Sequence, residues 1–258
     1  MESDKMNADF PVTRRILILL EEWFVPLVQP FLPPKKTRMK GGGFGNFYWD
    51  FEEHSAKTAM IGKAVRIISG LRAAMILADQ GYVTECSTIL RMTDDSVVEI
   101  GFLLDGLASR VPSKSYEEFV EQYFAVMQTG SDEYAQQSRV RWVSRDKVLA
   151  GYLRSIQGIG SDPEQMRKSM QFISYTHDKY VHGGYRTAME LYSGETNQFM
   201  LRGHDGDTAR EVAKWTVASG LLHSLLIFAK VAILFGDNDA ARKLYGGGIE
   251  LLDSGELP

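Results

Sequence analysis

The stretch DFEEHSAKTAMIGKAVRIISGLRAAMILAD, residues 50–79, decides the fold of this chain. An α-helix turns once in about 3.6 residues, so apolar residues at mixed spacings of three and four share one of its faces. The residues that follow this spacing are Ala59, Ile61, Ala64, Val65, Ile68, Leu71, Met75 and Ile76. The pattern predicts the longest helix of the chain, running from Asp50 to a stop at Gly81.

A second amphipathic stretch follows after a short turn. It is TECSTILRMTDDSVVEIGFLLDG, residues 84–106, and its apolar side consists of Ile89, Leu90, Val97, Val98, Ile100 and Leu104. Two long helices joined by a short turn pack against each other in opposite directions. The sequence therefore predicts an all-α fold, an antiparallel helical bundle with long central helices.

Helix start and stop signals recur on both sides of this pair. Pro11 opens an N-terminal helix that Pro26 and Pro30 should kink or end. Ser115 and Glu118 have the spacing of a capping box before the apolar residues of a further helix. Each signal adds a helix around the central pair.

The last third of the chain shows similar signals. Asp162 and Pro163 have the positions of a cap and a first helical residue. The stretch ELYSGETNQFMLRGHDG breaks the helical pattern, and we expect a short hairpin near residues 190–203 or an irregular loop. Asp207 should cap the apolar helix that follows, and the tail GGGIELLDSGELP should be loosely held.

A basic, glycine-rich stretch separates the N-terminal helix from the bundle. PPKKTRMKGGGFGNF, residues 33–47, has no apolar periodicity, so we expect a flexible loop or arm. This divides the chain into residues 1–48, a helix with a basic arm, and residues 49–258, the bundle. Neither the phosphate-loop nor the dinucleotide-binding glycine motif is present. The residues that could contact a nucleic acid backbone or an acidic partner, if the arm is not simply solvated, are Lys35, Lys36, Arg38 and Lys40.

The overall composition excludes several classes of protein. The 29 basic and 33 acidic residues give a net charge of −4, so nucleic acid is not attracted to the chain as a whole. The single cysteine, Cys86, excludes an internal disulfide, and the first residues lack the pattern of a signal peptide; we expect a cytoplasmic protein. Residues 216–235 are long enough to span a bilayer, but the polar residues among them, Lys230 above all, favour a core helix and no membrane partner.

Charged residues form a ridge on the second central helix. Arg91 and Asp95 are four residues apart, as are Asp95 and Glu99, so the three lie along one side of that helix. The ridge either faces solvent, where such pairs contribute little, or points into the bundle and needs partners there. A histidine from a neighbouring helix is one candidate partner.

The stretch YTHDKYVHGGY, residues 175–185, holds two of the five histidines. His177 and His182 are five residues apart and point about 140° apart on a helix, so they cannot easily share a metal. Asp178 lies one turn before His182 and could favour its charged form by accepting a hydrogen bond. His182 is either an acid or base, or it satisfies the last carbonyls of its helix. We expect neither a metal nor another cofactor.

Two motifs together resemble a known family. TILRMTDDSVVEIGFLL, followed about 80 residues later by ISYTHDKYVHGGY, is similar to uncharacterised bacterial all-helical domains related to the HEPN-like superfamily, over about residues 55–235. The resemblance implies an antiparallel bundle, often dimeric; many members are RNases of toxin–antitoxin or phage-defence systems. The nuclease members have an arginine that is separated from a histidine on the same helix by four to six intervening residues. Here Tyr175, Thr176 and His177 occupy those positions before His182, so the resemblance implies the fold and a homodimer but not RNase activity.

Three functions follow as hypotheses. The first, which we favour, is a helical interaction or regulatory module of a stress, toxin–antitoxin or phage-defence type, with an internal Arg/Asp/Glu/His cluster that fixes helix register. The second is a metal-independent RNase in which Arg91 binds phosphate and His182 is the general acid or base. The third is a small-molecule or nucleotide-binding bundle that uses the basic loop. RNA or another protein is the possible partner, and every version needs the charged ridge to meet the histidine-bearing helix end.

Overall fold

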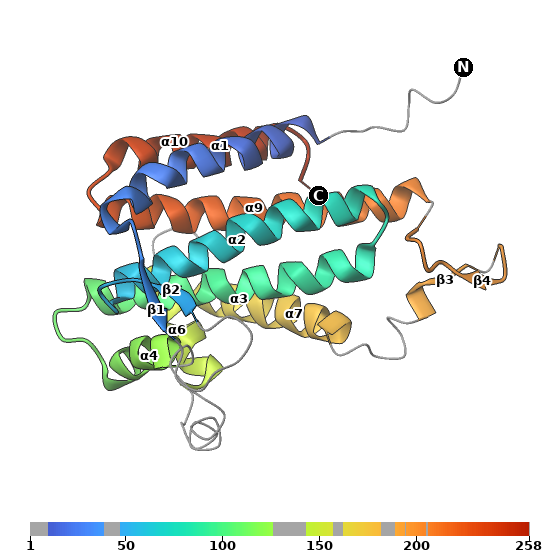
Figure 1. The fold of residues 1–258 in the computed structure, drawn as a ribbon. Helices are drawn as coiled ribbons and strands as arrows, with labels where there is room; N and C mark the ends of the chain where they lie inside the picture. Colours follow the sequence, from blue (N-terminus) through green and yellow to red (C-terminus); the bar gives the residue numbers. More distant parts are fainter. Residues whose placement is uncertain are drawn as a thin grey trace.

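A computed structural model provides the structure of the chain (Figure 1) and describes residues 10–38, 47–125, 143–156, 162–181, 189–193, 195–204 and 206–257. The described residues form an all-α antiparallel bundle with two small antiparallel hairpins, which confirms the predicted fold class. The helices are α1 (Pro11–Val28), α2 (Ala56–Asp79), α3 (Val83–Ala108), α4 (Lys114–Ala125), α6 (Arg145–Ser155), α7 (Pro163–Val181), α9 (Asp207–Leu234) and α10 (Asn238–Asp253), with a 3-10 turn η1 (Gln29–Phe31).

The bundle is layered. Figure 1 shows α1 and α10 side by side as an outer layer, α9 and α2 beneath them, and α3 and α7 beyond. Helix α9 packs on α1, α2, α3 and α10, so it connects the outer layer to the central pair. It is long and apolar enough to cross a membrane. Within the bundle, 56% of its most apolar 18-residue stretch is buried.

The central pair is α2 and α3, as predicted, with two corrections to α2. It begins at Ala56 rather than Asp50, because the Ser55 side chain accepts a hydrogen bond from Thr58 N and caps the helix there. It has 24 residues and is shorter than α9, which has 28. A positive φ of 78° at Gly81 follows its end, as the stop signal predicted.

Two of the apolar residues predicted on the buried face of α2 are exposed. Val65 is 52% and Ile76 63% exposed, whereas Ala64, Leu71 and Met75 are buried. At about 100° per residue, Val65 and Ile76 project 100° or more from the centre of the buried face. The prediction placed every apolar residue at a spacing of three or four on the same face, so the predicted buried face of α2 was too wide.

The N-terminal region joins the bundle. Helix α1 contributes Ile16, Leu20 and Phe24 to the same hydrophobic core as α2, α3 and α9. It continues through Pro26 and ends at Val28, just before Pro30 in η1.

The basic stretch was wrongly expected to be a loop at both of its described ends. Strand β1 (Lys35–Arg38) pairs antiparallel with β2 (Phe47–Asp50), with Lys35 opposite Asp50. Residues 39–46 between them lie outside the described part. The pairing satisfies backbone groups of two separate short segments, which hydrophobic periodicity cannot reveal.

The second hairpin confirms the short hairpin expected near residues 190–203. Strand β3 (Tyr192–Ser193) pairs with β4 (Gln198–Phe199). Asn197, next to β4, has a positive φ of 55°, which is typical of a tight turn.

Helix caps match the predictions in one case of three. Asp162 caps α7 by accepting a hydrogen bond from Glu164 N at 3.1 Å. Ser115 does not cap α4; the Ser113 hydroxyl accepts from Tyr116 N at 3.2 Å instead. Asp207 is the first residue of α9, and Gly206 has the cap position without a side-chain bond.

The prediction of a loosely held tail was wrong. Helix α10 includes Leu251, which is fully buried. The Glu256 carboxylate accepts hydrogen bonds from Val12 N and Thr13 N, both at 2.8 Å, and from Thr13 Oγ1 at 2.7 Å. The C-terminal tail therefore caps α1, whose own N-terminal residue provides no side-chain cap.

Candidate functional site

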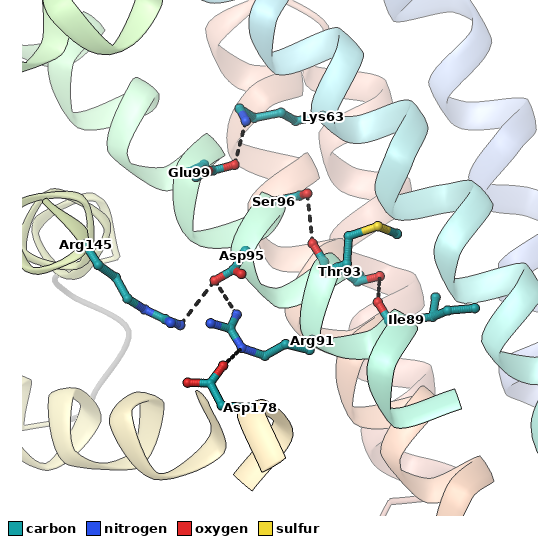
Figure 2. Close-up of polar contacts among 10 residues, drawn as sticks. Lys63, Ile89, Arg91, Thr93, Asp95, Ser96, Glu99, Arg145 and Asp178 are labelled. Atoms are coloured by element: carbon teal, nitrogen blue, oxygen red, sulfur yellow. Dashed lines mark hydrogen bonds and ion pairs between the residues drawn. The ribbon is translucent and has the colours of Figure 1, made fainter. Parts of the chain in front are cut away.

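Arg91 of α3 lies buried at the contact between α3 and α7. Its side chain is 7% exposed, and its Nε donates a hydrogen bond to Asp178 Oδ1 at 2.7 Å. Its Nη1 also pairs with Asp95, one turn further along α3. Figure 2 shows both carboxylates directed at the guanidinium, one from each helix. The charged ridge thus meets the histidine-bearing helix, as the sequence predicted.

The two carboxylates stabilise the charge of Arg91. Burial lowers the pKa of the guanidinium, but hydrogen bonds and charge from Asp95 and Asp178 outweigh it, so the pKa lies above its ordinary value. The side chains of Asp95 and Asp178 are 44% and 42% exposed, so both also face water. The result is a buried cation with two partly hydrated anions.

Asp95 extends the contact to a third helix. Its Oδ1 accepts a hydrogen bond from Arg145 Nη2 of α6 at 3.1 Å, in addition to the pair with Arg91 (Figure 2). We call Arg91, Asp95, Arg145 and Asp178 the Arg–Asp cluster. With two positive and two negative groups it is neutral, and it joins α3, α6 and α7.

Glu99 belongs to a different set of contacts. It accepts a hydrogen bond from Lys63 of α2 at 2.5 Å, and the Lys63 side chain is 9% exposed. The Lys63 ammonium lies 4.6 Å from the ring centre of Tyr123 and 5.4 Å from that of Phe119, a cation–π arrangement. The three residues of the ridge therefore do not form one set of contacts. Glu99 is two turns away from Arg91 and pairs with α2, whereas Arg91 pairs with Asp95 and with α7.

Two clefts flank Arg145. The first, of about 280 Å³, is lined by Lys63, Glu99 and the rings of Phe119 and Tyr123. The second, of about 260 Å³, is lined by Asp146, Asp178, Gln171 and Tyr175. Arg145 and Val98 line both clefts, so the Arg–Asp cluster lies at their common wall.

Several predicted site residues are outside what the structure describes. His182 and Lys40 are among them, as are the side chains of His177, Lys36 and Arg38. The predicted contact of His182 with Asp178 therefore stays a prediction. Lys35 is exposed on β1 and lines neither of the two clefts.

A buried polar contact between α6 and α9 was missed in the sequence. The Tyr152 hydroxyl and His223 Nε2 form a hydrogen bond, and their rings pack edge to face at 5.4 Å. One face of α9 also carries Lys230, whose Nζ donates to the Ser155 carbonyl at the end of α6. The signal was present: a histidine and a lysine seven residues apart, on one side of the largely apolar second half of α9.

Burial sets the charge states of this contact. It lowers the pKa of His223, and the negative charge of Asp94 on α3 opposes the effect. It raises the pKa of Tyr152, which the Asp94 charge raises further. Both groups are neutral at pH 7, because the imidazole is disfavoured as a cation and the phenol as an anion.

Among the residues that the structure describes, no three His, Cys, Asp or Glu side chains come together in a way that could hold a metal ion. The chain matches no known protein family, no curated protein and no solved structure.

Proposed function

We propose that this chain is a helical interaction and regulatory module, acting as a homodimer in a stress, toxin–antitoxin or phage-defence setting. The observation that carries the proposal is the state of Arg91: buried, charged, and bound by one carboxylate from its own helix and one from α7. The Arg–Asp cluster then holds α7 in register against α3.

The physical argument concerns what a buried guanidinium can do. A buried ion pair adds little net stability, because desolvation offsets most of the attraction, but removing one partner leaves an uncompensated charge. The planar guanidinium also donates its hydrogen bonds only in fixed directions. Arg91 therefore favours one placement of Asp178, and hence of α7, over slipped alternatives.

The same contacts weigh against Arg91 as a phosphate-binding residue. A phosphodiester that approached Arg91 would have to replace Asp178 or Asp95, or lie beside both. Among the described residues, the lining of the adjoining cleft has two acidic side chains, Asp146 and Asp178, and one basic side chain, Arg145. Such a lining repels a polyanion rather than attracting it.

The cluster is tested by a double-mutant cycle on Arg91→Met and Asp178→Leu, read by urea unfolding. Each single change should cost about 2–3 kcal/mol, because Arg91 or Asp178 loses one of its charged partners. The double variant should recover part of that loss. The matched control is the exposed pair Arg167 and Glu164 within α7, whose cycle should show no measurable coupling.

An RNA cleavage assay separates this proposal from the RNase hypothesis. The purified wild-type chain and the Arg91→Lys variant should cleave RNA at the same background rate. Lysine keeps the positive charge but cannot bind two carboxylates with the geometry of a guanidinium. Wild-type cleavage that Arg91→Lys abolishes, together with no coupling in the cycle, would establish the enzyme instead.

A second candidate function is binding of a small molecule in the first cleft. The cleft combines Lys63 and Glu99 with two aromatic rings, so it suits a small ligand that carries both charges and an apolar part. A thermal-shift screen with small zwitterions tests this. A ligand of the cleft should raise the melting temperature of the wild type but not of Val143→Trp, which fills its rim.

A further inference from the structure

Helix α10 has a second apolar face that nothing in the described chain covers. Arg242, Tyr245, Ile249 and Leu252 follow one another at spacings of three, four and three, the repeat of a coiled-coil seam. Tyr245 is 54%, Ile249 50% and Leu252 57% exposed. We call these four residues the α10 seam.

The inner face of α10 is already used. Ala240, Ala241, Leu244 and Leu251 are buried against α1 and α9. In Figure 1, α10 lies in the outer layer of the bundle with α1, so its other side faces away from the core. The apolar side chains of the seam are therefore exposed to solvent and take no part in the packing of the monomer.

Gly246 lies beside the seam, and none of the described residues packs closely enough against it to require a glycine. A glycine within a helix costs about 1 kcal/mol relative to alanine. A Cβ at Gly247 would lie 3.2 Å from Trp23, so Gly247 permits close packing, whereas a Cβ at Gly248 would make an ordinary contact with Leu222 at 3.5 Å. A Cβ at Gly246 would meet nothing within 4 Å. Such a glycine suits the close approach of a backbone from outside the chain.

The charges at the two ends of the seam are of opposite sign. Arg242 is near the N-terminal end of α10, where it also forms an exposed ion pair with Asp239 of its own helix at 3.2 Å. Asp253 is at the C-terminal end and is exposed. If two copies of α10 pack antiparallel with their centres near residue 247, Arg242 of each lies opposite Asp253 of the other. A parallel arrangement would place like charges together.

We propose that two copies of this chain associate through the α10 seam as an antiparallel, two-fold symmetric helix pair. The proposal rests on the homodimer of the proposed function and names its surface. A symmetric interface must be complementary to itself, and the antiparallel seam is, in both its apolar residues and its charges. A pair formed by one helix from each copy is at the small end of specific interfaces, so the dimer should depend on protein concentration.

Sedimentation equilibrium of the full chain over a wide range of concentrations tests the surface. The wild type should be a dimer that dissociates on dilution, and Ile249→Glu should be a monomer with unchanged circular dichroism. Val111→Glu is the matched control, because Val111 is 82% exposed before α4. A wild-type monomer at every concentration, or a dimer that Ile249→Glu does not weaken, overturns the proposal.

A charge exchange tests the antiparallel geometry. Arg242→Asp places two carboxylates at each end of the pair and should weaken the dimer by about tenfold. Adding Asp253→Arg exchanges the charges and should restore the wild-type association. If the double variant is no tighter than Arg242→Asp, the antiparallel pairing is wrong.

The two proposals can fail separately. Arg91→Met and Asp178→Leu lie in the Arg–Asp cluster between α3 and α7, so they should leave dimer dissociation unchanged. Ile249→Glu should in turn leave the Arg91–Asp178 coupling energy unchanged. A wild-type dimer that Ile249→Glu does not weaken would contradict the α10 seam but not the homodimer of the proposed function, and an absent Arg91–Asp178 coupling would contradict the role of the cluster but not the seam.

Discussion

His223 and Cys86 illustrate how burial controls single ionisable groups in this bundle. His223 of α9 has its pKa lowered by burial and hydrogen-bonds to Tyr152. Cys86 of α3 is 1% exposed, and burial raises its pKa to about 12. In both cases the neutral form is favoured, since the surroundings cannot solvate the charged form.

Acid should destabilise the chain through His223. In the unfolded chain a histidine takes up a proton near pH 6.5, whereas the folded pKa is lower. Between these two values only the unfolded state binds the proton, so stability falls as the pH drops below about 6.5, by at most about 1.4 kcal/mol per pH unit. Urea midpoints at pH 7 and pH 5 should show a smaller loss for His223→Gln than for the wild type. Equal losses in the two proteins would contradict this assignment.

The Cys86 thiol should be unreactive in the folded protein. Only the thiolate attacks a disulfide reagent, and at pH 8 the raised pKa leaves almost none of it. Labelling with an aromatic disulfide should therefore be slow in buffer and immediate in concentrated urea. Fast, complete labelling under native conditions would show that α3 opens locally.

Contacts between distant segments position whole helices. Arg14 of α1 binds Asp79 of α2 at 2.6 Å, and Lys214 of α9 lies 3.2 Å from the same carboxylate. Glu256 caps α1 from a position 243 residues away from Thr13. Helix α1 is thus attached by polar contacts as well as by its apolar face.

Removal of the Glu256 cap should loosen α1. Glu256→Ala leaves two backbone N–H groups and one hydroxyl without their acceptor, a loss of about 1–2 kcal/mol. Thr13→Val should lose a smaller part, because Glu256 keeps both backbone bonds. Urea unfolding measures both changes. Glu250→Gln, which affects an exposed ion pair with Arg15, is the control and should differ from the wild type by less than about 0.5 kcal/mol.

At the scale of the whole molecule, one hydrophobic core runs from α1 to α10. Its fully buried members include Ile16 of α1, Leu71 of α2, Val97 of α3, Leu225 of α9 and Leu251 of α10. A core that is shared by so many helices favours a single cooperative unfolding transition.

Hydrogen exchange should reflect this arrangement. Amides at the centres of α2, α3 and α9 should exchange slowest, through global unfolding, and those of the exposed hairpin β3–β4 fastest. The measurement is native-state exchange followed by mass spectrometry in low urea. Exchange of α1 and α10 well before α9 would show that the outer layer opens as a separate unit.

Local sequence patterns determined a substantial part of this structure. Periodicity predicted the α2–α3 pair and the all-α class, and turn residues predicted the hairpin near residues 190–203. The spacing of Arg91 and Asp95 indicated a charged ridge that would meet the histidine-bearing helix, although the partner suggested there was a histidine and the contact that the structure shows is with Asp178. These predictions were possible because helix geometry relates neighbours three and four residues apart.

Only the tertiary structure decided which polar groups lost water and which partners they found. In the folded chain Arg91 is buried, whereas Asp95 and Asp178 are half exposed. Glu99 pairs with Lys63, and Glu256 binds the start of α1. The physical reason is that such contacts depend on how helices cross, and a shift of a few ångströms between helices exchanges one partner for another. The spacing of residues along the chain does not determine the angle and position at which two helices cross.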